Sequence, residues 1–151
     1  MLRQPVVEID AEMFEKVWRL TCFGGFLLGR EAARRMGPRG RGTILFTGAT
    51  ASLRGGANFS AFASAKAGLR ALAQSLAREM GPKGVHVAHV VIDGLIDTAA
   101  VRARYGERVD ALGPDGAMAP DAIAEAYWQL HAQPRSAWTL EFDLRPWSEK
   151  F

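Results

Sequence analysis

The sequence predicts an α/β fold in which about three parallel strands are flanked by helices. Helical and strand patterns alternate along the chain, which is the order typical of a parallel sheet with helical crossovers. Two short runs, 43–47 and 85–92, are almost continuously apolar, as strands covered on both faces are. The 151 residues, 48% of them apolar, suffice for one domain with its own core.

The expected helices are marked by capping residues and by glycine–proline breaks. Asp10 and Asn58 are suitable N-caps for two long helices, and Gly37-Pro38 and Gly81-Pro82 end them. The last expected element is a half-exposed edge strand over 138–144, where apolar and polar residues alternate. The expected helical segments, the third of them a helix or a lid, cover residues 10–36, 58–80, 98–112 and 120–131.

The strand expected at 43–47 is unlike an edge strand. It carries no charge and no proline, so in a three-stranded sheet one row of its backbone donors and acceptors would be left uncovered. We therefore expect this strand to pair with another, which means either that the sequence is truncated or that a partner covers the edge.

Composition narrows the classes of function. The single Cys22 cannot form an internal disulfide, which favours a cytoplasmic setting, and no residue cluster suggests a metal site. Acidic residues interrupt the first fifteen positions, and no apolar run reaches membrane-spanning length, so neither a signal peptide nor a membrane helix is expected. Net charge is +3, and the arginine-rich run 34–41 is most simply a solvated helix end. The alternative is an anion or nucleic-acid site, but no aromatics interleave with these arginines, so we expect no nucleic acid.

Three segments carry a recognisable pattern: the strand at 42–47, the motif Phe62-Ala63-Ser64-Ala65-Lys66 and the loop Asp93-Gly94-Leu95-Ile96-Asp97-Thr98. Together they resemble the C-terminal part of the short-chain dehydrogenase/reductase family, over about residues 10–144. The resemblance implies the C-terminal part of a Rossmann-like doubly wound parallel sheet. It also implies that residues 1–151 form a single partial domain of that kind, by descent an oxidoreductase that uses NAD or NADP.

The family's four polar catalytic positions fall at Ala49 for its serine, Phe62 for its tyrosine, Lys66 for its lysine and about Thr21 for its asparagine. In the family the serine orients the substrate carbonyl, the tyrosine transfers a proton, and the asparagine holds a water. The lysine holds the nicotinamide ribose and lowers the pKa of the phenol. A phenyl ring has no proton to give, so the resemblance implies impaired or altered proton transfer.

The loop 93–98 resembles the family's Pro-Gly-x-x-x-Thr segment, which touches the nicotinamide carboxamide. Gly94 and Thr98 match, Ile96 lies between them, and Asp93 replaces the proline. The family's Gly-rich phosphate turn has no counterpart, because the superficially similar run 47–54 has serine and arginine where the second and third glycines belong. We therefore expect weak NAD(P) binding by this chain alone.

Other acids could replace the phenol, although each has a simpler explanation. His89, like His86, lies in a strand and is more simply packed there, Tyr105 is expected on the surface, and Asp97 can cap the next helix. The candidate acids are His89, Asp93, Asp97 and Tyr105.

The two long helices are rich in small and apolar residues, which permits close helix packing. In the family these helices form the subunit contact, so the resemblance implies a homo-oligomer, most simply a homodimer, through helices 10–36 and 59–80. Three functions remain open: an NAD(P)-dependent oxidoreductase with an unknown small-molecule substrate, a catalytically inactive binding or dimerisation protein on the same fold, and an enzyme using an unrelated acid near 93–98.

Overall fold

The computed structural model describes residues 3–150 and has the predicted α/β architecture. Its sheet contains β1 (Gly42–Thr47), β2 (Val85–Ile92) and β3 (Glu141–Leu144) in the order β1-β2-β3. Both strand pairs are parallel, with Gly42 opposite Val85 in the first and His89 opposite Glu141 in the second. The sheet matches the expected three parallel strands.

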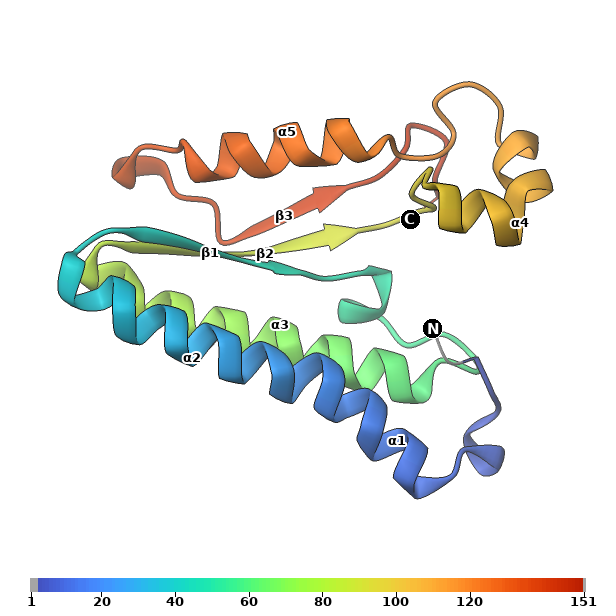
Figure 1. Cartoon of the computed structure of the whole chain (residues 1–151), viewed down its shortest axis with the longest axis horizontal. Helices are drawn as coiled ribbons and strands as arrows, with labels where there is room; N and C mark the ends of the chain where they lie inside the picture. The colour runs from blue at the N-terminus through green and yellow to red at the C-terminus, as the bar shows by residue number, and fades with distance from the viewer. Residues whose placement is uncertain (1–2, 151) are drawn as a thin grey trace.

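Helices cover both faces of this sheet (Figure 1). The first long helix comprises α1 (Ala11–Trp18), a five-residue π turn (Arg19–Phe23) and α2 (Gly24–Met36). In Figure 1, α2 and α3 (Ser60–Met80) lie below the sheet and α5 (Pro120–His131) lies above it. The helix α4 (Ala99–Ala111) extends beyond the carboxyl ends of the strands. Short 3-10 turns occupy Val6–Glu8, Gly37–Arg39, Thr50–Ser52, Gly81–Lys83 and Arg135–Ala137.

Of three expected helix caps, two were wrong and one was confirmed in position. Asn58 adopts a left-handed conformation with φ of 69°, so Phe59 takes the N-cap position of α3. Asp97 does not cap α4, because the Thr98 hydroxyl accepts the hydrogen bond from the Val101 amide instead. Asp10 occupies the N-cap position of α1, but its side chain makes no capping hydrogen bond.

The last strand is shorter than the alternating pattern suggested. Pairing begins at Glu141, whereas Trp138 stacks on the His86 ring with centroids 5.0 Å apart. Gln133 also binds Thr139, accepting from its amide and donating to its hydroxyl. These side-chain contacts hold residues 138–139 outside the strand, so alternation alone overestimated its length.

Alternation along the strands divides the core into two clusters, one on each face. Under the sheet, the buried side chains of β1 and β2 pack against Leu69 and Ala73 of α3. Helices α2 and α3 also approach each other closely, because a Cβ added at Gly25 of α2 would lie 2.3 Å from the Leu69 side chain of α3. Above the sheet, Val90 and Ile92 pack with Leu130 of α5. Burying each such aliphatic side chain contributes about 1.5–3 kcal/mol.

Within residues 3–150, β1 pairs with β2 alone, so its other edge carries no strand. Helix α5 covers the upper face of β1 rather than this edge. Its Tyr127 hydroxyl lies 2.8 Å from the Thr47 hydroxyl, and His131 Nδ1 lies 2.9 Å from the Thr43 hydroxyl. Among the described residues no strand pairs with the backbone groups of that edge, although the Thr47 carbonyl oxygen accepts a hydrogen bond from Lys66.

Candidate functional site

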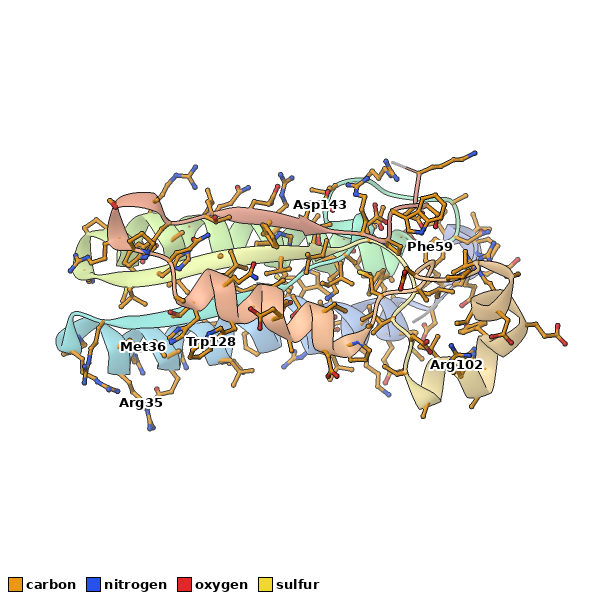
Figure 2. The ribbon with its side chains drawn as sticks, turned by 90° about the horizontal axis from the view of Figure 1, so that it is seen from above. Arg35, Met36, Phe59, Arg102, Trp128 and Asp143 are labelled. Atoms are coloured by element: carbon orange, nitrogen blue, oxygen red, sulfur yellow. The ribbon has the colours of Figure 1, made fainter. Side chains whose placement is uncertain are left out.

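A cavity of about 560 Å³ opens at the carboxyl ends of β1 and β2. Ligands bind at this end of open parallel sheets. In Figure 2 the labelled Phe59 lies near the carboxyl ends of the strands. The walls of the cavity come from the loop after β1, the start of α3 and the loop after β2. The lining residues are Thr47, Gly48, Ala49, Thr50, Ala51, Arg54, Gly55, Gly56, Phe59, Phe62, Lys66, Ile92, Gly94 and Ile96.

Lys66 is fixed at the wall of this cavity. Its ammonium donates a hydrogen bond of 2.8 Å to the backbone oxygen of Thr47, the last residue of β1. The Phe62 ring lies one helical turn earlier, with its centroid 5.8 Å from Lys66 Nζ, a distance at which a cation and a ring attract. Burial lowers the pKa of the Lys66 ammonium. The aromatic ring and the amine therefore face the cavity together.

Five of the residues proposed from the sequence meet at this cavity: Ala49, Phe62, Lys66, Gly94 and Ile96. The other two lie outside its lining.

Thr21 belongs to the π turn of the first helix, and Thr98 uses its hydroxyl to cap α4.

Asp93, which the sequence suggested as a possible acid at the proline position of the loop, lies just behind the cavity and binds one of its lining residues. Its side chain is buried, with 3% of the residue exposed, and its Oδ1 accepts a short hydrogen bond from the Thr50 hydroxyl. Its Oδ2 has no hydrogen-bond partner, and the nearest guanidinium nitrogen of Arg145 lies 4.0 Å away. Asp93 is the one candidate acid of the four whose side chain binds a lining residue.

Thr50 was missed by sequence reasoning. The available signals were a threonine beside Ala49 and an aspartate where the resembled loop has proline. Forty-three positions separate the two residues, so only the fold reveals their contact.

Behind Lys66, His89 lies fully buried under the sheet. Its Nδ1 is 3.3 Å from a carboxylate oxygen of Glu141, to which Arg70 makes two hydrogen bonds of 2.6 and 2.7 Å. Burial lowers the pKa of His89, whereas the hydrogen bonds from Arg70 lower the pKa of Glu141. These groups join α3 to β2 and β3 and do not line the cavity, as expected for a packed histidine.

The remaining candidates have structural partners. Asp97 forms an ion pair with Arg102, and Tyr105 is 42% exposed at a kink in α4. The helices within residues 3–150 are all too short or too polar to cross a bilayer. The same residues contain no group of three metal-binding side chains.

Known proteins share both the sequence and the fold. A family model described as Enoyl-(Acyl carrier protein) reductase matches residues 1–139. The 3-oxoacyl-[acyl-carrier-protein] reductase MabA of Mycobacterium avium is 36% identical over 70% of this chain and 41% of its own length. A crystal structure of a short-chain dehydrogenase from Rhodopseudomonas palustris is 48% identical, with a TM-score of 0.78 over 97% of this chain and 58% of that one.

More distant structures share the fold alone. One is 4-hydroxyisoleucine dehydrogenase complexed with NADH, 24% identical with a TM-score of 0.78, aligned over 97% of this chain and 65% of its own. The chain spans about 41% of the MabA sequence. The match to the family model over most of the chain, together with the shared fold, shows that this protein belongs to the short-chain dehydrogenase/reductase family of oxidoreductases.

Proposed function

We propose that this chain binds the nicotinamide end of NAD or NADP in the cavity and lacks the proton-transfer chemistry typical of its family. The observation that carries the proposal is the position of Lys66, whose ammonium is held 2.8 Å from the Thr47 carbonyl at the cavity wall. An ammonium has three protons, so two remain to donate to ribose hydroxyls. The family's lysine has this role.

The cavity suits a flat, largely apolar ring. Its volume of about 560 Å³ lies within the range of small-ligand sites, and Phe62, Ile92 and Ile96 supply apolar walls. Gly94 has φ of 141° and brings backbone close to the cavity without a side chain. These features fit nicotinamide riboside better than the adenylate half, whose phosphates need a Gly-rich turn that the 151 residues do not contain.

The reaction of this family joins a hydride with a proton transfer, and a bound nicotinamide would supply or accept the hydride. Proton transfer would depend on the chain's own side chains. Phe62 has no proton, and Ala49 has no hydroxyl to orient a carbonyl. Loss of a positioned general acid lowers rates by about 10²–10⁴. We therefore propose an oxidoreductase domain with impaired or altered proton transfer.

The second candidate function is a binding or dimerisation protein without redox chemistry. It is favoured by apolar side chains exposed on α1, the π turn and α2, together with the exposed small residue Ala67 on α3. Scattered apolar residues are ordinary on a surface, but a patch on one pair of helices marks an interface. We propose a homodimer through these helices. The exposed residues are Met13, Phe14, Trp18, Leu20, Phe26, Leu27 and Leu28.

The nicotinamide proposal is tested by titrating the ¹⁵N-labelled chain with nicotinamide mononucleotide and following amide shifts. We expect binding with a Kd of about 1–10 mM, equivalent to roughly 3–4 kcal/mol. The shifted amides should be those of residues 47–56, 62–66 and 94–96. Lys66→Met should abolish binding. Lys83→Met, in the 3-10 turn that follows α3, should leave binding unchanged. Shifts elsewhere, or equal effects of the two variants, would contradict the proposal.

A further inference from the structure

We infer that Thr50 and Asp93 form a hydrogen-bond-accepting dyad that makes the cavity select a neutral ligand bearing a hydroxyl or amide donor. The ligand would have an apolar body, in keeping with the cavity walls. The inference deepens the proposed function, since it concerns the same cavity, but it depends on two residues that the nicotinamide proposal does not use.

Protons in this dyad can be assigned from its chemistry. A carboxylate only accepts hydrogen bonds, so the Thr50 hydroxyl donates its single proton to Asp93 Oδ1. Thr50 lines the cavity, whereas Asp93 lies behind it and is buried. The hydroxyl oxygen then presents lone pairs, and no proton, to a ligand. A hydrogen bond to a charged acceptor also increases electron density on that oxygen, which makes it a stronger acceptor.

The burial of Asp93 strengthens its electrostatic effect on the Thr50 hydroxyl, because a hydrogen bond is stronger where the local dielectric is low. A buried carboxylate is costly unless its oxygens are satisfied, and here Oδ2 has no hydrogen-bond partner. Arg145 forms a close ion pair with Asp143 and a longer one, of 4.0 Å, with Asp93 Oδ2. Asp93 is thus a buried carboxylate held by the Thr50 hydroxyl and by one long ion pair, directly behind a wall of the cavity.

The hydrogen-bonding role of this wall is the reverse of the one in the family. The family's serine donates a hydrogen bond to a substrate carbonyl. Here Ala49 has no hydroxyl, and the neighbouring Thr50 hydroxyl already donates its proton to Asp93. The cavity should therefore bind an alcohol better than the ketone of the same shape. A carboxamide NH₂ offers the same donor chemistry as a hydroxyl, so nicotinamide itself is a second source of the preferred group.

Two matched pairs of probes separate these sources: cyclohexanol against cyclohexanone, and nicotinamide against methyl nicotinate. Amide-shift titrations of the whole chain should show each donor binding about five- to tenfold more tightly than its partner, the size of one hydrogen bond. A preference confined to the first pair identifies a hydroxyl ligand, and one confined to the second identifies a carboxamide. Equal binding within both pairs would overturn the inference.

Variants assign the preference to the dyad. Thr50→Val should remove it, and Thr50→Ser should retain it because the hydroxyl is kept. Asp93→Asn should weaken it at least threefold, since the acceptor behind Thr50 loses its charge. A preference that survives Thr50→Val refutes the dyad. If the parent chain shows the alcohol preference but does not bind nicotinamide mononucleotide, the nicotinamide proposal is refuted and the dyad stands. If the parent chain binds nicotinamide mononucleotide but shows no preference for donors, the dyad alone is refuted.

Discussion

Replacing Gly48 by alanine should destabilise the fold by overpacking, mainly against the buried His89 ring and also against the Ser52 hydroxyl, 2.9 Å from the added Cβ. A Cβ built at Gly48 would lie 2.3 Å from Nε2 and 2.4 Å from Cε1 of His89. Ordinary Cβ contacts begin near 3.4 Å, so the ring or the backbone must move by about 1 Å. His89 is fully buried, with Glu141 3.3 Å from its other nitrogen, so the ring has no free space into which to turn.

The expected loss of stability is about 1–3 kcal/mol, the usual effect of overpacking a core. For a chain of this size each kcal/mol lowers Tm by about 2–4 °C. Urea unfolding followed by tryptophan fluorescence measures the change. Gly81→Ala is the matched control, because a Cβ there meets nothing within 4 Å and the backbone is helical with φ of −55°. It should be neutral or slightly stabilising.

A double-mutant cycle assigns the effect to the ring. His89→Ala alone should destabilise by about 2–4 kcal/mol through the cavity it leaves. In the double variant the new methyl group occupies part of that space, so the combined loss should be smaller than the two single losses added together. Gly48→Ala with the stability of Gly81→Ala, or strictly additive losses in the double variant, would refute the argument.

Three further predictions concern pH, assembly and chemistry. Burial lowers the pKa of His89 in the folded chain, so below about pH 6.5 the unfolded chain binds more protons than the folded one. The contribution of the neutral His89 ring to the free energy of unfolding should therefore be fully present above that pH. As the pH falls toward the folded pKa, the free energy of unfolding should decrease by up to about 1.4 kcal/mol per pH unit. Urea unfolding between pH 7.5 and 5 should show this decrease in the parent chain, and His89→Gln should flatten it. A variant with the same pH dependence as the parent would contradict the assignment to His89. Ala67→Glu should convert the proposed homodimer to monomer in sedimentation velocity, while a parent chain that is already monomeric would end the proposal. Phe62→Tyr combined with Ala49→Ser should give no steady-state reductase turnover with NADPH and a simple ketone, because the phosphate cradle is still lacking; robust turnover would show that the cradle is dispensable.

Much of the fold could be predicted because each element is specified locally. Apolar runs marked β1 and β2, and the helix spanning 120–131 was predicted with the bounds that α5 has. Errors arose where a tertiary contact or a special backbone conformation overrode the local pattern. Asn58 adopts a positive φ and so does not cap α3. Trp138 stacks on His86 and lies outside the strand.

The candidate site divides in the same way. Phe62 and Lys66 share one helix face, so their spacing alone placed them side by side. Thr21 could not be placed by spacing, because it lies in a π turn that interrupts the regular helix. The partner of Asp93 was equally hidden, since a pairing across two loops leaves no periodic signal in the sequence.

The departures from the family pattern are consistent with one another when charge is considered. Ala49 and Phe62 remove the two hydroxyl donors that would face a substrate carbonyl. Asp93 brings a carboxylate to the same end of the sheet and accepts the hydrogen bond that the Thr50 hydroxyl donates. A site that had only lost residues would be expected to gain apolar side chains in their place. The buried carboxylate of Asp93 instead leaves the Thr50 hydroxyl oxygen as a hydrogen-bond acceptor at the cavity wall, which suits a ligand that donates. These substitutions together favour a site that has changed from binding ligands that accept hydrogen bonds to binding ligands that donate them. They are less consistent with a site that has only lost its catalytic residues.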